Sequence, residues 1–317
     1  MNFDTLINKY RTLIDVELSN VYNVGPESIQ KPIKHILRGG KRFRPILCML
    51  TTSSFKGDEQ SSIIIGTAIE LLHNFSLIHD DIMDNDNIRH GYKTIHNKWN
   101  QSIAILSGDA VLALALLKLN NLSKKKSKII EEFNNALIEI CEGQALDIEF
   151  ENKKNISIKE YVNMVDKKTG YMIGFCSHSG GIISDLTNES QQILKKYGQL
   201  LGRAFQIQDD LLEVVSSEKN MGKSLQSDFV LNKKTFLTVK ARAIDSKYVD
   251  KCINKSKSDF NYGFSLYKDF LIDNDIISYT NDIIKEILID SNKLLDKLNL
   301  DNNLLYKYTE LILNRKH

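Results

Sequence analysis

The distribution of proline is the feature that most constrains the fold of this chain of 317 residues. Its three prolines are Pro26, Pro32 and Pro45, so the whole stretch from Ile46 to His317 contains none. Proline is the residue that a helix interior tolerates least, whereas sheets and loops use it at edges and turns. Its absence over such a length favours long helices.

The spacing of apolar residues agrees with this. In AIELLHNFSLIHDDI they recur every three or four positions, at Ile69, Leu72, Phe75, Ile78 and Ile82. QQILKKYGQLLGRAFQIQDDLLEV and NDIIKEILIDSNKLLDKL have similar spacing, and no strand-like alternation or Gly/Ser-rich linker occurs. We therefore expect an all-α fold, with residues 1–317 forming a single-domain bundle of long antiparallel helices. Breaks are expected at GGKRFRP, residues 85–91, NNLSKKKSK, ENKKNIS, the SGG around Gly180, and SSEKNMGKSLQSD.

Composition excludes several classes of protein. The formal net charge of +2 gives no overall field that would gather nucleic acid, so we expect no nucleic-acid partner. The four cysteines are far apart and form no CxxC pair, which argues against a disulfide framework and a zinc site and favours a cytoplasmic location. The N-terminus lacks the continuous apolar core of a signal peptide. The apolar segment 103–119 is interrupted by SGD, so we expect a buried core helix there and no transmembrane segment.

Two clusters of acidic residues follow apolar helical faces. In DDIMD, the spacing of Asp80, Asp81 and Asp84 places their carboxylates on one face of a helix. A calcium loop does not fit, because its pattern needs acids or Asn at alternate positions and the third such position counted from Asp84 is Ile88. A solvated helix end remains the simpler alternative for this cluster taken alone.

The second cluster changes that balance. In FQIQDDLLEV, the residues Asp209, Asp210 and Glu213 repeat the spacing of the first cluster. Carboxylates from two helices of a bundle can face each other across its interior. Oxygen sites with open positions suit magnesium, which binds through a few carboxylates together with waters and substrate phosphates. The paired clusters therefore indicate a phosphate ester held by metal ions.

Basic and polar residues complement these acids. The segment GGKRFRP has two glycines, which let backbone approach an anion, followed by three cations. His73 lies two helical turns before Asp80, on about the same face, and can reach a phosphate, whereas we expect His79 to be a packing residue. Further candidates for contact with an anion or a metal-bound water are Arg89, Gln144, Asp147, Lys168, Thr169, Gln206, Lys223, Lys233 and Lys234. A single surface lysine is more often only solvated.

The order of these motifs resembles the all-trans polyprenyl diphosphate synthases. The markers are GGKRFRP, HNFSLIHDDIMD, IRHG, LSGDAVL, GQALD, KKTG, FQIQDDLLE, GKSLQSD and KKT, and they span residues 39 to 235. The resemblance implies an isoprenoid synthase fold, a helical bundle around a central cavity that forms a homodimer. It also implies that isopentenyl diphosphate is condensed with an allylic diphosphate, and that three Mg²⁺ ions bind between the acidic motifs.

The resemblance also assigns roles to residues. It implies that metal ions are bound by Asp80, Asp81, Asp84, Asp209, Asp210 and Glu213. It implies that the allylic diphosphate is bound by Arg89, Lys168, Gln206, Lys223 and Lys233. Lys41, Arg44 and His73 would bind isopentenyl diphosphate, and Thr169 and Gln144 would face the reacting carbons. The family usually has a second arginine at His90, an aspartate at Glu213 and a glycine at Gln226, so these are departures. We expect His90 either to weaken the contact with the homoallylic phosphate or to make it dependent on pH.

The resemblance also bears on product length. Phe75 lies five residues before Asp80, about 7.5 Å along a helix, beside the small Ser76. A single aromatic residue at this place resembles the archaeal short-chain enzymes that stop at geranylgeranyl diphosphate. Farnesyl diphosphate is the alternative product. A terpene cyclase and a regulatory subunit of a heteromeric synthase are the alternative functions. GGKRFRP with His73 argues against the cyclase, and the retained acids argue against the subunit.

Overall fold

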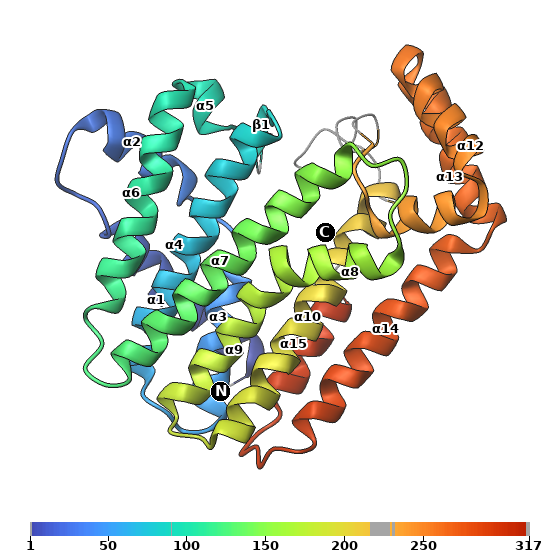
Figure 1. The fold of residues 1–317 in the computed structure, drawn as a ribbon. Helices are drawn as coiled ribbons and strands as arrows, with labels where there is room; N and C mark the ends of the chain where they lie inside the picture. Colours follow the sequence, from blue (N-terminus) through green and yellow to red (C-terminus); the bar gives the residue numbers. More distant parts are fainter. Residues whose placement is uncertain (1, 90, 216–228, 230–231, 315–317) are drawn as a thin grey trace.

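The computed structural model describes residues 2–89, 91–215, 229 and 232–314, and its helices form the bundle shown in Figure 1. The first seven α-helices are α1 (Phe3–Ser19), α2 (Glu27–Ile36), α3 (Phe43–Ser54), α4 (Glu59–Met83), α5 (Ile95–Lys98), α6 (Gln101–Leu119) and α7 (Lys126–Glu151). The others are α8 (Ile158–Val165), α9 (Tyr171–Ile183), α10 (Asn188–Val215), α12 (Phe236–Ser258), α13 (Phe260–Asp273), α14 (Ile276–Leu295) and α15 (Leu304–Leu313). A π-helix, η1 (Asp166–Gly170), joins α8 to α9, and two short antiparallel strands, β1 (Ile88–Arg89) and β2 (Tyr92–Lys93), follow α4.

The all-α prediction is confirmed, and the prolines explain where helices can begin. Pro26 precedes α2, and Pro45 lies in the first turn of α3, where a missing backbone N–H costs nothing. Only Pro32 lies beyond the first turn of a helix, the short α2. α4 packs between α3 and α6, and α10 packs between α9 and α14, so these two long helices carry much of the core.

Most predicted breaks lie between helices, but the one at SGG is wrong. α9 continues through Gly180 and Gly181 and ends only after Ile183. A Cβ atom on Gly180 would lie 2.6 Å from Cβ of Thr51 and 2.9 Å from the carbonyl oxygen of Cys48. The glycine therefore serves the close approach of α9 to α3, not a turn. The predicted break at SSEKNMGKSLQSD lies outside the described residues.

The prediction of a buried core helix at residues 103–119 is wrong for one side of α6. Both α4 and α6 are long and apolar enough to cross a membrane by length and composition. In the most apolar 18-residue stretch of α4, 78% is buried inside the structure, but in the corresponding stretch of α6 only 33% is buried. Leu106 and Leu117 are 54% and 62% exposed, so a helix that is apolar on all sides has left one apolar face uncovered.

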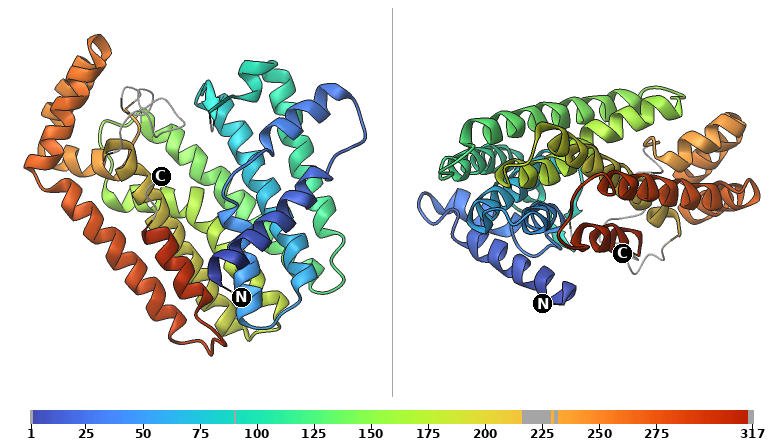
Figure 2. Two further views of the ribbon diagram at one scale, coloured as in Figure 1. Left: turned by 180° about the vertical axis from the view of Figure 1, so that it is seen from behind. Right: turned by 90° about the horizontal axis from the view of Figure 1, so that it is seen from below.

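Two pairs of helices pack outside the central part of the bundle. α1 and α15, from opposite ends of the chain, lie side by side on the face seen from behind in Figure 2. α12 and α13 pack on each other as a helical hairpin that extends from the bundle at the upper right of Figure 1.

Candidate active site

The first acidic cluster lies at the C-terminal end of α4, where each of two acids is paired with a cation. Nε of Arg89 donates to Oδ1 of Asp81 at 2.8 Å, and Nζ of Lys233 lies 2.7 Å from Oδ2 of Asp84. Arg89 reaches back because β1 follows the turn after α4, and it also pairs with Asp86 at 3.2 Å. Asp81 is only 2% exposed, so its charge depends on this partner.

Asp80 completes the cluster, and its surroundings oppose its negative charge. Burial raises the pKa of Asp80, the nearby ammonium of Lys168 lowers it, and the carboxylate of Asp84 raises it again. A positive charge placed near Asp80 would therefore stabilise the ionised form of its carboxylate.

The second acidic cluster lies on α10, and its most buried member is Asp210. Its Oδ2 accepts hydrogen bonds from the hydroxyl of Tyr161 at 2.6 Å and from the backbone N–H of Phe236 at 2.8 Å. Gln206, one turn earlier on α10, donates to Oδ1 at 3.2 Å. Burial nevertheless raises the pKa of Asp210 to about 7, against the opposing effect of these three donors. Asp209 and Glu213 are half-buried on the same helix.

The π-helix η1 carries two polar side chains, Lys168 and Thr169, that contact residues near the acidic clusters. Nζ of Lys168 donates to Oδ2 of Asp147 at 2.6 Å, and the hydroxyl of Thr169 donates to the amide oxygen of Gln206 at 3.1 Å. Both Lys168 and Thr169 lie in η1, and π-helical turns are frequent at functional sites. η1 presses closely on α7, since a Cβ on Gly143 would lie 2.3 Å from the backbone nitrogen of Lys168.

The three cations of the GGKRFRP segment lie in different surroundings. Arg42 is 5% exposed and pairs with Glu70 at 2.7 Å and with Asp15 at 2.8 Å. Arg44 points toward α4, where its NH1 lies 3.2 Å from Nε2 of His73. Lys41 is exposed, with its ammonium 5.9 Å from the centre of the Phe43 ring. Arg44 and His73 therefore form a pair beside the start of α3.

The donor set around the acidic clusters fits a hard cation, although no cation site is preformed among the described residues. No group of three or more His, Cys, Asp or Glu side chains is close enough to hold a metal ion within residues 2–89, 91–215, 229 and 232–314. Asp81 and Asp84 are instead paired with cations, and Asp210 is held by hydrogen bonds. Their oxygens, together with waters and phosphate oxygens, match the ligands that Mg²⁺ takes in proteins.

Gln144 is a buried amide near these groups. It is 5% exposed on α7, one turn before Asp147, and neither its Nε2 nor its Oε1 has a hydrogen-bond partner in the described part of the chain. Buried polar atoms without partners are costly, so this amide is suited to meet a ligand.

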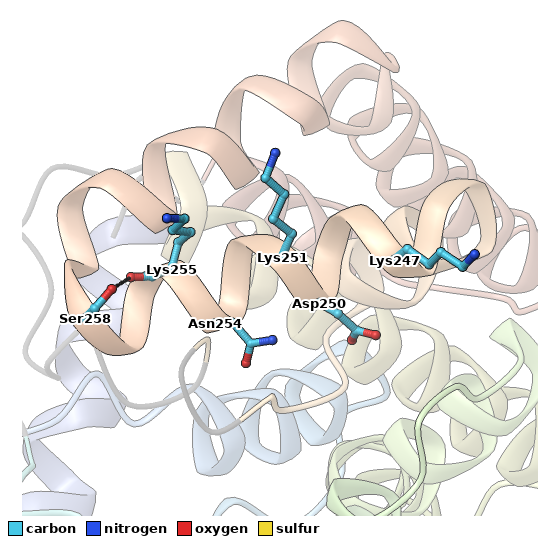
Figure 3. Close-up of a pocket in the computed structure, with 6 residues that line it drawn as sticks. All are labelled: Lys247, Asp250, Lys251, Asn254, Lys255 and Ser258. Atoms are coloured by element: carbon cyan, nitrogen blue, oxygen red, sulfur yellow. Dashed lines mark hydrogen bonds between the residues drawn. The ribbon is translucent and has the colours of Figure 1, made fainter.

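A separate cavity of about 590 Å³ runs along α12 (Figure 3). The residues that line it are Lys247, Asp250, Lys251, Asn254, Lys255 and Ser258. The three lysines repeat every four residues along one face of one helix, which is the usual pattern of a solvated charged surface. This cavity lacks the paired acids of the site on α4 and α10.

Comparison with known proteins decides the family. The sequence profile described as polyprenyl synthetase matches residues 26–263. The chain belongs to the polyprenyl synthetase family. It is 36% identical over 240 residues to the short chain isoprenyl diphosphate synthase of Methanothermobacter thermautotrophicus, covering 74% of each chain. It is 35% identical over 244 residues to the geranylgeranyl diphosphate synthase of Saccharolobus solfataricus, covering 75% of this chain and 72% of the relative.

The fold gives the same result. A crystal structure of a geranylgeranyl pyrophosphate synthase superposes with a TM-score of 0.92 at 28% identity, covering 100% of both chains. The predicted family, isoprenoid synthase fold and prenyltransferase class are therefore confirmed.

In this polyprenyl synthetase, most of the residues singled out in the sequence lie on elements that meet. α4 supplies the first acids and His73, α7 supplies Gln144 and Asp147, η1 supplies Lys168 and Thr169, and α10 supplies Gln206 and the second acids. Asp84 and Lys233, far apart in sequence, are in contact. His90, Lys223 and Gln226 lie outside the described residues.

Sequence reasoning missed two groups of this polyprenyl synthetase. Tyr161 holds Asp210 from α8, and an isolated tyrosine in an amphipathic helix gives no signal of this. Glu151, at the end of α7, is close enough to Lys233, Asp147 and Asp84 for their charges to affect it, and burial raises its pKa. Glu151 lies four residues after Asp147 and so on the same helix face, and this spacing could have indicated it as a site residue.

Phe75 and Ser76 lie before Asp80 on α4, as expected from a helix. The Phe75 ring is half-buried and lies 4.7 Å from the ring of His79, centre to centre. The hydroxyl of Ser76 donates to the backbone oxygen of His73 at 2.9 Å. His79 packs against α6, where Gly108 leaves it room, because a Cβ there would lie 2.3 Å from its Nε2.

Proposed function

We propose that this polyprenyl synthetase condenses isopentenyl diphosphate with an allylic diphosphate (dimethylallyl, geranyl or farnesyl), and that its main product is geranylgeranyl diphosphate. The observation that carries the proposal is the arrangement of two acidic clusters, on α4 and α10, with Lys168, Arg89 and Lys233 beside them. Acids and cations in one place suit an anionic ester that is bound together with metal ions.

Mg²⁺ is the metal that these residues fit. Asp80, Asp81 and Asp84 would hold it on α4, and Asp209, Asp210 and Glu213 on α10. Bound Mg²⁺ supplies positive charge that stabilises the diphosphate as a leaving group. The raised pKa values of Asp80 and Asp210 support this site, since burial of their carboxylates is compensated when a cation binds. The number of ions, three by resemblance, stays a prediction.

The cations of the site would exchange partners when substrate binds. Arg89, Lys168 and Lys233 now neutralise Asp81, Asp147 and Asp84. We propose that they turn to the allylic diphosphate and stabilise the charge that grows on it as the carbon–oxygen bond breaks. Gln206 would orient the same diphosphate, through the hydrogen bonds that it shares with Thr169 and Asp210.

A second anion site would take isopentenyl diphosphate. Lys41, Arg44 and His73 supply its charge and hydrogen bonds. The Nε atom of Arg44 is buried and has no hydrogen-bond partner in the part of the chain that the structure describes, which supports an anion there. Gln144 and Thr169 would face the reacting carbons, where their oxygens stabilise positive charge. His90 and Lys223 keep the diphosphate-binding roles that the resemblance implies.

Product length would be set by Phe75, with the small Ser76 beside it. A half-buried aromatic ring one and a half helical turns before the acids can block a growing chain. Relatives of this chain are named for geranylgeranyl diphosphate, which supports that product over farnesyl diphosphate.

We also propose that the protein is a cytoplasmic homodimer that pairs through α6 and α7. Exposed apolar side chains stand on both helices, including Leu106 and Leu117 on α6 and Ile138 on α7, which is 56% exposed. Exposed apolar side chains on two helices that contact each other are typical of an oligomer contact. The cysteines that the structure describes are all free, as expected in a reducing compartment.

Substitution of one buried acid tests the assignment. Asp81→Asn keeps the shape of the side chain but removes the charge that pairs with Arg89. We expect turnover with isopentenyl and farnesyl diphosphates to fall at least 100-fold, with the far-UV circular dichroism unchanged. Asp282→Asn, on the exposed side of α14, is the matched control and should keep wild-type turnover. Wild-type turnover in Asp81→Asn would overturn the site.

A further inference from the structure

A basic surface lies at the end of the bundle where α2, α5 and the two short strands are found (Figure 1). Two segments supply it, KPIKHILRGGK (residues 31–41) and YKTIHNKW (residues 92–99), and neither contains an Asp or a Glu. Because the whole chain has a net charge of only +2, this excess of cations is local. We use the name basic patch for four exposed cations and two aromatic residues of these segments, which are Lys34, Arg38, Lys93, Lys98, Tyr92 and Trp99.

His35, in the last turn of α2, joins the two segments of the basic patch. Its Nε2 donates to the backbone oxygen of Lys93 at 2.8 Å, although the two residues are 58 positions apart in the chain. Its ring stands edge to face against the rings of Trp99 and Tyr92, with 5.4 and 6.0 Å between the ring centres. These contacts fix the cations of both segments on one surface.

The charges of the basic patch are not neutralised within the described part of the chain, where none of its four cations forms an ion pair with a carboxylate. The ammonium of Lys98 lies instead 3.4 Å from Nδ1 of His35 and 4.7 Å from the centre of the Trp99 ring. Burial lowers the pKa of His35, and the nearby charges of Lys98 and Arg38 lower it further. Like charges this close repel one another, so an anionic surface placed against them would be stabilising.

Exposed apolar side chains stand beside these cations. Tyr92 is 61% exposed and Ile88 is 48% exposed, and both belong to the short hairpin of β1 and β2. In that hairpin Ile88 pairs with Lys93, and Tyr92 pairs with Arg89, whose side chain reaches Asp81. The basic patch therefore borders the first acidic cluster. Cations mixed with exposed aromatic and aliphatic side chains are typical of proteins that lie on a membrane–water interface.

We propose that the basic patch docks this enzyme on the surface of an anionic lipid membrane. Its four cations would face the lipid phosphates, and Tyr92 and Ile88 would enter the interface between head groups and acyl chains. The choice of a membrane over another polyanion rests on the proposed function, because a geranylgeranyl chain is apolar and partitions into lipid. This orientation places the end of α4, where the product would be released, next to the membrane.

Co-sedimentation with vesicles tests the docking in the absence of substrate and Mg²⁺. We expect the wild-type protein to bind vesicles of phosphatidylglycerol and phosphatidylcholine, and to bind vesicles of phosphatidylcholine alone at least tenfold more weakly. Lys34→Gln combined with Lys98→Gln should weaken binding to the anionic vesicles about 25-fold. Tyr92→Ser keeps every cation and should weaken it at least threefold. The control, Lys285→Gln combined with Lys293→Gln, removes two cations from α14 and should leave the affinity unchanged.

Kinetics separates this inference from the proposed function. The variant that lacks both Lys34 and Lys98 should keep the initial rate with isopentenyl and farnesyl diphosphates within twofold, because neither lysine lies in the proposed substrate sites. Unchanged affinity in this variant, or equal binding to neutral and anionic vesicles, would overturn the inference while turnover remained. Release of the protein from anionic vesicles by single-stranded RNA at an equal phosphate concentration would also overturn it. Loss of all turnover in the wild-type protein would instead refute the proposed function.

Discussion

Substitution of Gly143 by alanine tests whether the contact between α7 and η1 places the catalytic groups. The new Cβ would lie 2.3 Å from the backbone nitrogen of Lys168 and 2.6 Å from its Cα atom. Ordinary contacts begin near 3.4 Å, so η1 must move by about 1 Å. The obstacle is backbone, so no side-chain rotation relieves it.

That displacement should affect both stability and rate. Overpacking of this kind lowers the free energy of unfolding by about 1–3 kcal/mol, partly offset by the better helix propensity of alanine. Displacement of Lys168 and Thr169 by about 1 Å should lower kcat about 100-fold, because catalytic groups tolerate little misplacement. The rate should therefore fall much more than the stability.

Steady-state kinetics and urea unfolding measure both effects. Gly181→Ala is a matched control on α9, where the new Cβ would meet Cδ1 of Leu194 at 2.8 Å, the end of a flexible side chain. We expect this control to keep kcat within twofold. A Gly143→Ala enzyme with wild-type kcat and wild-type unfolding free energy would refute the reasoning.

Three further predictions concern stability, product length and assembly. Nδ1 of His178 lies 3.4 Å from Oε2 of Glu132, the ammonium of Lys195 donates to the same oxygen at 2.8 Å, and these two neighbours lower the pKa of Glu132 to about 2. Because the folded pKa is the lower one, this stabilisation is present above pH 4.5 and is lost as the pH falls. Between pH 7 and pH 3, the free energy of unfolding of the wild-type protein in urea should fall by about 2 kcal/mol more than that of Glu132→Gln. An equal fall in both proteins would contradict this prediction. Phe75→Ala should yield products longer than the wild-type product in thin-layer chromatography, and an unchanged distribution would exclude Phe75 as the stop. Leu106→Lys should convert the proposed dimer to monomer in analytical ultracentrifugation, and a dimer in this variant would exclude α6 as its contact.

Local patterns in the sequence predicted the helices well, including the two that carry the acidic clusters. The apolar spacing before Asp80 and before Asp209 is a property of one helix, so it can be read without knowing the rest of the fold. The same reasoning misjudged the segment 103–119, because an apolar helix has the same pattern whether its faces are covered by the same chain or left for a partner. That residues 1–317 form one domain stays a prediction.

Contacts between distant segments could not be predicted in this way. The pattern GGKRFRP marked three cations alike, but Arg42 is a structural residue that pairs with Glu70, and only the fold determines which side chain points inward. The pairing of Lys233 with Asp84 and the bond from Tyr161 to Asp210 depend on how α4, α8 and α10 pack. The π-helical turn at Lys168 likewise has no signature in a short sequence window.

The most direct test of this account is the reaction itself. Purified protein would be incubated with labelled isopentenyl diphosphate, Mg²⁺ and dimethylallyl, geranyl or farnesyl diphosphate in turn, and the dephosphorylated products would be sized. The account predicts geranylgeranyl product that depends on both substrates and disappears when EDTA is added. Absence of elongated product with every starter would contradict it and would favour a regulatory subunit of a heteromeric synthase.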